Sequence, residues 1–146
     1  MPIIIPRAAS LKILNFLDDL DAREVLIVEG ARQVGKTTAI EQALIGRAAL
    51  RVNLEGDARF RERLDASESF EDFEFYLRDR FKFNPADREQ ILFLDEAQES
   101  DKVGAYVRFM KERWEGAKVI LSGSSMSRLF RDCLLYTSDA ADDTPC

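Results

Sequence analysis

The sequence of 146 residues contains no histidine, and its two cysteines, Cys133 and Cys146, both lie within the last fourteen residues. Without histidine, the chain has no imidazole that could act as a general base or as a metal ligand. The lack of cysteine before residue 133 excludes thiol catalysis, a disulfide framework and a cysteine zinc site from the body of the chain. Chemistry in this body must therefore depend on other residue types.

Long apolar runs and an excess of basic charge are also missing. No apolar run approaches the roughly eighteen residues that a membrane span needs, and the N-terminus has neither the basic region nor the long apolar region of a secretory signal. The formal net charge of −6 gives no overall basic surface for nucleic acid. We therefore expect a soluble, cytoplasmic protein of one domain, with no membrane partner and no support for a nucleic-acid partner.

Apolar runs of strand length alternate with helical patterns along the chain. The patterns predict an N-terminal segment 1–22 with a helix behind Ser10, strands at 25–28, 50–54, 91–94 and 118–121, and helices at 35–46, 57–83 and 103–114, with another beginning at Ser125. In the helix 57–83, Phe70, Phe73, Leu77 and Phe81 form one apolar stripe that we expect to face the core. Strands that are apolar on both faces and alternate with helices indicate an α/β fold, with a parallel sheet covered by helices on both faces.

One motif between the first strand and the next helix has the pattern G-x-x-x-x-G-K-[ST] of a phosphate-binding loop. It consists of Gly30, Ala31, Arg32, Gln33, Val34, Gly35, Lys36 and Thr37. The two glycines allow successive N–H groups to curl around a phosphate, and the helix that follows directs its positive N-terminal end at the same anion. Lys36 would reach the β- and γ-phosphates, and Thr37 would place a hydroxyl on Mg²⁺.

Two carboxylates, Asp95 and Glu96, follow the most apolar strand. Parallel α/β sheets bind ligands at this carboxyl end of their strands. A carboxylate here could simply cap the next helix, but beside a phosphate loop we predict that Asp95 holds Mg²⁺ and that Glu96 activates a water for attack on the γ-phosphate.

Three serines, Ser122, Ser124 and Ser125, follow the fourth strand. One of them could contact the γ-phosphate if this strand lies between the other two, and Ser124 is the first choice for this role. The alternative is an ordinary turn and helix cap, for which serine is also favoured.

Together these motifs resemble the AAA+ class of P-loop ATPases, and more closely the AAA_14-type ATPase domain that precedes a DUF4143 domain in bacterial and archaeal proteins. The residues that carry the resemblance are Ile5–Arg7, Gly30–Thr38, Leu94–Gln98 and Gly123–Ser125. The resemblance implies a three-layer P-loop fold, ATP contacts along residues 30–38 including Thr38, and Mg²⁺ at Thr37 and Asp95. It also implies catalysis by Glu96 with Lys36, and sensing of the γ-phosphate by Ser124.

Residues 133–146 lack a helical or strand period and resemble the translation of a sequencing adapter. We expect this tail to be non-native or disordered and the native sequence to stop near Asp132; a natural acidic terminus is the alternative. Residues 23–132 would then form an incomplete ATPase core that is truncated after its fourth strand. In the AAA+ strand order 5-1-4-3-2, the strand 25–28 would be left at an unpaired edge.

The leading hypothesis is Mg²⁺-dependent ATP hydrolysis, coupled to a C-terminal output domain and aided by an arginine from a neighbouring copy of the protein. The alternative is a nucleotide-binding switch with negligible hydrolysis, because this chain has no identifiable arginine finger. We expect this chain to be inactive by itself. A GTPase is disfavoured because no N-K-x-D motif is present, and a metabolite kinase because Glu96 favours water as the acceptor.

Overall fold

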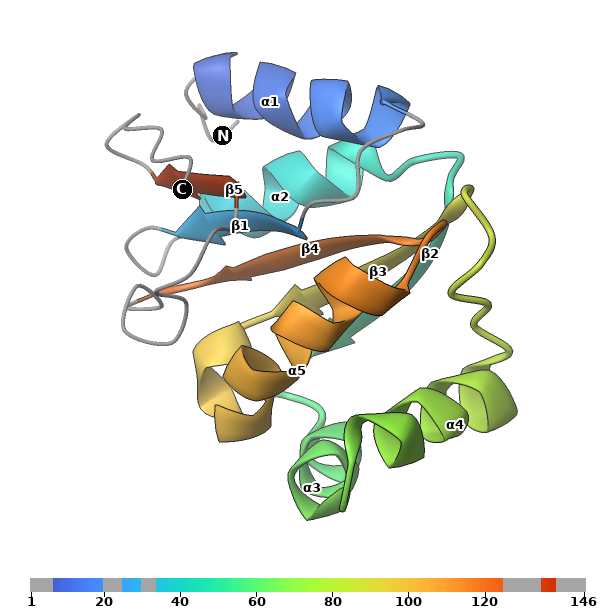
Figure 1. The fold of residues 1–146 in the computed structure, drawn as a ribbon. Helices are drawn as coiled ribbons and strands as arrows, with labels where there is room; N and C mark the ends of the chain where they lie inside the picture. Colours follow the sequence, from blue (N-terminus) through green and yellow to red (C-terminus); the bar gives the residue numbers. More distant parts are fainter. Residues whose placement is uncertain (1–6, 20–24, 30–33, 125–134, 139–146) are drawn as a thin grey trace.

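The protein forms a sheet between two layers of helices (Figure 1). The computed structural model describes residues 7–19, 25–29, 34–124 and 135–138. In chain order the elements are α1 (Arg7–Asp18), β1 (Val25–Glu29), α2 (Val34–Ala43), β2 (Ala48–Asn53), α3 (Ala58–Ala66), α4 (Phe70–Phe81), β3 (Gln90–Asp95), the 3₁₀-helix η1 (Ala97–Glu99), α5 (Asp101–Arg113), β4 (Lys118–Gly123) and β5 (Leu135–Ser138).

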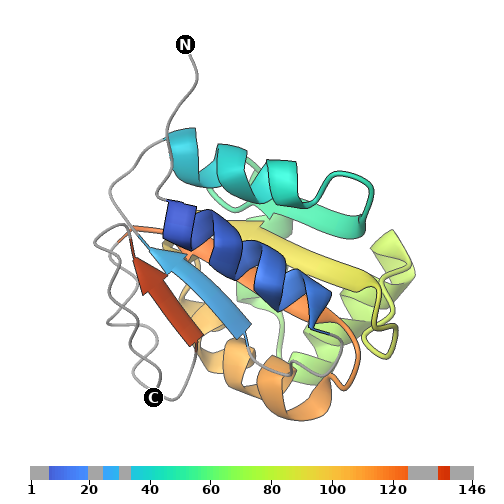
Figure 2. The same cartoon turned by 90° about the horizontal axis from the view of Figure 1, so that it is seen from above.

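The five strands form one sheet in the order β2-β3-β4-β1-β5, and all neighbours are parallel. The α/β fold with a parallel sheet, predicted from the alternation of strands and helices, is confirmed. Because the strands are parallel, β1, β4 and β3 all end at the same edge of the sheet. In the view from above, β1 (blue) and β5 (red) lie side by side and point the same way (Figure 2).

Apolar side chains cover both faces of the sheet. Along β3, Leu92 and Leu94 belong to one buried cluster, whereas Ile91 and Phe93 belong to the other, because successive side chains of a strand point to opposite faces. Helices α1 and α2 cover one face, and α3, α4 and α5 lie on the other (Figure 1). Together the two clusters contain the buried hydrophobic residues of the described part of the chain, which explains the three layers.

A buried lysine, Lys118, joins α1 to the start of β4. Its side chain is only 3% exposed, and its Nζ donates to the carbonyl oxygens of Phe16 (2.5 Å) and Leu17 (2.8 Å) and also to that of Asp19. These carbonyls lie at the end of α1, where a helix has no partners of its own for them. Burial lowers the pKa of Lys118 below its usual value, although Asp19 partly opposes this effect. Helix α1 is therefore an integral part of this core.

The segment 57–83, expected to be one helix, contains two. The hydroxyl of Ser67 bonds to the carbonyl oxygen of Leu64 (2.6 Å) and ends α3, and Ser69 caps α4 by accepting from the N–H of Asp72 (3.1 Å). Serine side chains compete in this way with the helical hydrogen bonds. The predicted apolar stripe is mostly buried, but Phe81, its last member, is 37% exposed.

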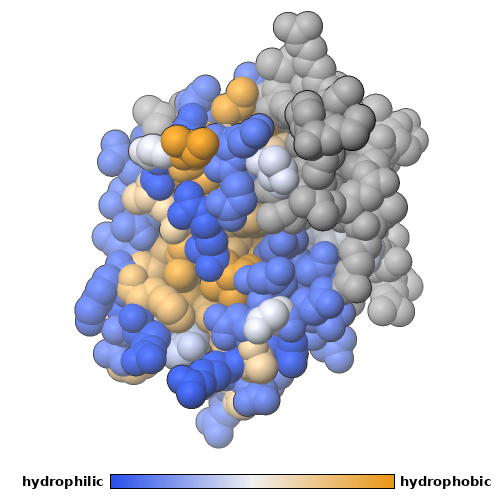
Figure 3. All heavy atoms as spheres, turned by 180° about the vertical axis from the view of Figure 1, so that it is seen from behind, coloured by the Kyte–Doolittle hydropathy of each residue, from blue (hydrophilic) through white to orange (hydrophobic). Residues whose placement is uncertain are grey.

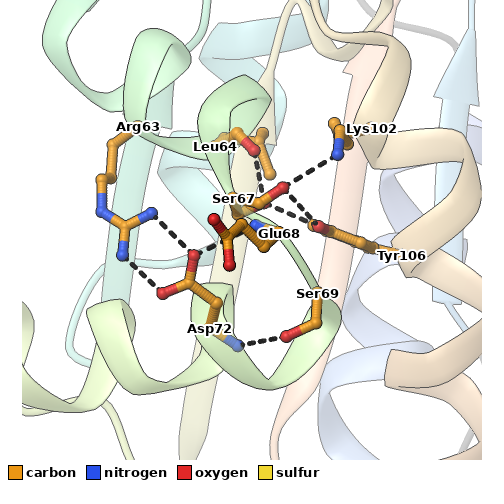
Figure 4. Close-up of polar contacts among 8 residues, drawn as sticks. All are labelled: Arg63, Leu64, Ser67, Glu68, Ser69, Asp72, Lys102 and Tyr106. Carbon is orange, nitrogen blue, oxygen red and sulfur yellow. Dashed lines mark hydrogen bonds and ion pairs between the residues drawn. The ribbon is translucent and has the colours of Figure 1, made fainter.

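Polar contacts attach the pair α3–α4 to α5 (Figure 4). The hydroxyls of Ser67 and Tyr106 lie 2.6 Å apart in a buried position, and Nζ of Lys102 donates to the carbonyl oxygen of Ser67 at 2.9 Å. Arg63 makes two hydrogen bonds to the carboxylate of Asp72, which connects α3 with α4. These contacts fix the two helices on α5, the helix that follows the acidic end of β3.

The strand β5 corrects the expectation that the sheet ends with its fourth strand. Residues Leu135–Ser138 pair in parallel with β1, so β1 is an internal strand and its outer edge is covered. The physical reason is that an unpaired strand edge is a template for pairing, and Tyr136 and Thr137 are of residue types that favour strands. The adapter origin proposed for these residues stays a prediction, as do the boundaries 1–22, 23–132 and 133–146.

The surface carries some apolar side chains. Seen from behind, an apolar area lies among hydrophilic residues (Figure 3). The large apolar side chains among the described residues that are more than a third exposed are Leu14, Ile45, Phe75 and Phe81. Within the described part of the chain, no helix combines the length and apolar character that crossing a membrane requires.

Candidate functional site

The phosphate-loop motif occupies the connection between β1 and α2. Residues 30–33, with the predicted contacts Gly30, Ala31, Arg32 and Gln33, lie outside the described residues. Helix α2 begins at Val34, so the backbone of Gly35, Lys36, Thr37 and Thr38 forms its first turns. The sequence therefore has the strand, connection and helix that a phosphate loop requires, with the N-terminus of α2 close in the chain to the end of β1.

Helix α2 is anchored by its apolar side chains. Ala39 and Ile40, together with Leu44 directly after the helix, are buried in the same cluster as Leu26 and Val28 of β1. This packing fixes the direction of α2 relative to the strand that precedes the motif.

Strand β4 lies between β1 and β3, as the sensor hypothesis requires. Val28 of β1 is in register with Ser122 of β4, and Leu94 of β3 is in register with Leu121. The residues that follow β4 therefore stand between the end of β1 and the acidic end of β3.

Asp95 is a buried carboxylate at this edge. It is 8% exposed, and its Oδ1 accepts from the hydroxyl of Ser122 at 2.6 Å and from the N–H of Glu96 at 2.9 Å. Ser122 is itself fully buried. A charge taken out of water must be stabilised by hydrogen bonds, and these two donors hold the carboxylate in a fixed orientation at the end of β3.

The alternative of a helix-capping carboxylate is not what the geometry shows. Helix α5 is capped by Ser100, whose hydroxyl accepts from the N–H of Lys102 at 3.2 Å and donates to the carboxylate of Asp65 at 2.5 Å. Neither Asp95 nor Glu96 makes a side-chain cap of η1 or α5. The two carboxylates are therefore not required for starting the helix that follows them.

Glu96 has an unusual backbone conformation, with φ 54° and ψ 47° in the left-handed region. For a residue other than glycine this conformation costs about 1–3 kcal/mol, and such residues cluster at functional sites. Its side chain is held as well, because Oε2 accepts from Nε2 of Gln98 at 2.6 Å.

The two described serines at the end of β4 make different contacts: Ser122 lies within the strand, and Ser124 directly follows it. The hydroxyl of Ser122 bonds to Asp95, whereas Ser124 donates its backbone N–H to Oε1 of Gln98 at 3.3 Å. The third candidate, Ser125, lies outside the described residues. Sequence reasoning missed the contact of Ser122 with Asp95 and any role for Gln98. The only signal for Gln98 was its place in the segment Leu94–Gln98, which carries part of the family resemblance.

The described residues contain no group of three cysteine or carboxylate side chains that could hold a metal by themselves. Mg²⁺ usually keeps several waters and binds to one or two carboxylates together with substrate phosphates. Asp95 offers one such carboxylate.

A cavity of about 490 Å³ lies at the opposite edge, where β2, β3 and β4 begin. Its lining includes Arg47, which pairs with Asp18 at 2.8 Å, and Lys118, which is bonded to the end of α1. These charged groups make contacts within the fold. The cavity lies at the start of the strands, whereas Asp95 lies at the end of β3.

A comparison with protein families gives a match over residues 22–137 to a family model, AAA_14, described as an AAA domain. The matched segment includes the phosphate-loop motif, the acidic end of β3 and all of β4. No curated protein matches the chain.

Proposed function

The chain belongs to the AAA domain family AAA_14, and from this premise we propose that it binds ATP with Mg²⁺ at the carboxyl edge of its sheet and hydrolyses the ATP there. One observation supports the proposal most. Strand β1, after which the phosphate-loop sequence begins, ends at the same edge of the sheet as the buried Asp95, and Ser122 of the intervening strand bonds to that carboxylate. The family indicates nucleotide binding in general, and this geometry supports the finer assignment.

Residues Gly30–Thr38 bind the phosphates in this proposal. Their N–H groups at the start of α2 donate to phosphate oxygens, and Lys36 contacts the β- and γ-phosphates. The anchored helix α2 supplies the positive end of its dipole at the same place.

Thr37 and Asp95 are the residues that would hold Mg²⁺. The donor set fits this ion, because a hydroxyl and one buried carboxylate are hard oxygen ligands that leave positions for phosphate and water. When bound, Mg²⁺ supplies neutralisation of the negative charge that develops on the β- and γ-phosphates.

Glu96 is the proposed general base. It takes a proton from a water whose oxygen attacks the γ-phosphorus, while the bond from this phosphorus to the bridging oxygen of ADP breaks. Lys36 stabilises the charge on the transferred group. Ser124, which follows the strand between β1 and β3, hydrogen-bonds the γ-phosphate.

In the proposed cycle, hydrolysis is coupled to an output domain of the DUF4143 kind, and a neighbouring copy supplies an arginine to the γ-phosphate. Such an arginine is worth about 10³–10⁵ in rate when it is supplied in trans. Specific activity should therefore rise steeply with protein concentration.

A nucleotide-binding switch with negligible hydrolysis is the second candidate. It is favoured by one observation, the short bond between Gln98 and Glu96, which engages the carboxylate of the proposed base. A switch would bind ATP and Mg²⁺ in the same way but would not need Glu96.

The test combines calorimetric titration of ATP with a turnover assay at several protein concentrations. ATP binding with Mg²⁺, followed by turnover that Glu96→Gln abolishes without weakening binding, supports the ATPase. Missing turnover at low concentration alone is expected of both candidates, because a chain by itself lacks the arginine of a neighbouring copy. Binding without turnover at any concentration supports the switch. A folded chain that binds no ATP contradicts both.

A further inference from the structure

Five residues at the ends of β3 and β4 are joined by four hydrogen bonds into a ring that the backbone closes. Asp95 accepts from Ser122 and from the N–H of Glu96, Glu96 accepts from Gln98, and Gln98 accepts from the N–H of Ser124. The chain itself connects Ser122 to Ser124 through Gly123, which completes the ring. The ring therefore links the proposed metal ligand, the proposed base and the proposed sensor turn.

The side chain of Gln98 bridges the residues that follow the two strands, Glu96 after β3 and Ser124 after β4. A backbone N–H can only donate, so the bond from Ser124 requires the oxygen of the amide to face β4. The NH₂ group must then face Glu96, where Nε2 lies 2.6 Å from Oε2. The contact with Ser124 thus fixes which end of the amide meets the carboxylate.

The rest of η1 holds Gln98 in place. Ala97 is fully buried in the core, and Ser100 is fully buried and caps α5. Between these two anchors, Gln98 is half-buried at the level of the strand ends. Glu96 on the other side is fixed by its left-handed backbone and by its N–H bond to Asp95. Both partners of the short bond are therefore held on well-packed backbone.

We propose that Gln98 is a positioning residue for hydrolysis, which orients the carboxylate of Glu96 toward the attacking water and couples it to the turn at Ser124. This inference rests on the proposed function. An amide donor fixes one oxygen of a carboxylate without supplying a positive charge that would neutralise it, so Glu96 can still accept a proton.

A matched pair of variants separates the two bonds of the amide. Gln98→Glu keeps the length of the side chain and an oxygen that can accept from Ser124, but it replaces the donor to Glu96 by a second carboxylate. Gln98→Ala removes both bonds. Gln42→Ala, which alters an exposed glutamine on α2, serves as the control.

The first measurement is hydrogen exchange at the N–H of Ser124 in the nucleotide-free chain. Exchange should be slow in the wild type and in Gln98→Glu, and at least about tenfold faster in Gln98→Ala, because protection follows the hydrogen bond. Equal exchange in all three proteins would show that the contact is not formed and would overturn the inference whatever the turnover.

The second measurement is turnover with ATP affinity. Both Gln98 variants should bind ATP within about twofold of the wild type but lower kcat about 10- to 100-fold, because an interaction that acts in the transition state changes kcat and not ground-state binding. Unchanged kcat in Gln98→Glu contradicts the inference alone. A wild type that binds ATP without hydrolysing it at any protein concentration contradicts the proposed hydrolysis first and the inference with it.

Discussion

Because Ser122 donates a hydrogen bond to Asp95, we predict that Ser122→Ala lowers the stability of the protein much more than Ser124→Ala does. In Ser122→Ala, the carboxylate of Asp95 loses a donor at 2.6 Å while both positions stay buried. Hydrogen bonds to charged groups contribute about 1.5–3 kcal/mol. Alanine fits the space of serine, so loss of packing adds little, and we expect the free energy of unfolding to fall by about 2 kcal/mol.

The matched control is Ser124→Ala. Ser124 contributes its backbone N–H to the bond with Gln98, and alanine keeps this group. We therefore expect a change within about 0.5 kcal/mol, as for most substitutions away from buried contacts.

The assay is urea unfolding of the full chain, followed by fluorescence of Trp114. With a slope of about 2 kcal/mol per molar urea, the midpoint of Ser122→Ala should fall by about 1 M and that of Ser124→Ala should hardly move. In an Asp95→Ala background the cost of Ser122→Ala should largely disappear. Equal midpoints for the two serine variants, or an undiminished cost without Asp95, would refute the reasoning.

Three further predictions concern the backbone and the pH. Glu96→Gly should unfold about 1 kcal/mol less readily than Glu96→Ala in urea, because glycine tolerates φ 54°; equal stability would contradict the strain. Gly116→Ala should cost about 1–3 kcal/mol in the same assay, because a Cβ would lie 2.2 Å from the carbonyl oxygen of Ala86, whereas Gly56→Ala, with its nearest atom at 3.9 Å, should be tolerated. The hydrogen bond from Arg63 lowers the pKa of Asp72 below its ordinary value of 3.8. The stability that this pair contributes is therefore present above pH 3.8 and is lost as the pH falls through the lowered pKa. Unfolding measured between about pH 6 and pH 2 should show a smaller acid loss in Asp72→Asn, and an identical pH profile would count against the pair.

Much of the fold could be predicted from local sequence patterns. The apolar runs at residues 25–28, 91–94 and 118–121 are apolar on both faces and must be buried. Because they alternate with amphipathic helices, they indicate a parallel sheet covered by helices. The edge location of Asp95 followed from the same logic, because parallel strands end together.

The misses depend on contacts between distant parts of the chain. Which serine contacts Asp95 depends on which residue of β4 lies beside the end of β3. A shift of β4 by one residue would turn each of its side chains to the opposite face of the sheet. Lys118 stabilises the end of α1 across about a hundred residues of sequence, and no local pattern marks that contact. The break at residues 67–69 depends on serine side chains whose partners include Tyr106 on another helix.

Strand β5 was missed for a different reason. Four residues without a clear period give no strand signal by themselves, and they pair because β1 presents a free edge. The expectation of an incomplete sheet relied on the missing period of residues 133–146 and on their resemblance to a translated adapter, and neither can show that a short segment finds an edge to pair with.

The central claim is that ATP binds where β1, β4 and β3 end, and calorimetric titration of the chain with ATP and Mg²⁺ tests it most directly. We predict saturable binding by the wild type that Lys36→Ala weakens at least about tenfold, because the lysine contacts the β- and γ-phosphates. Folded wild-type chain that takes up no ATP at millimolar concentration, or equal affinity in Lys36→Ala, would contradict the claim.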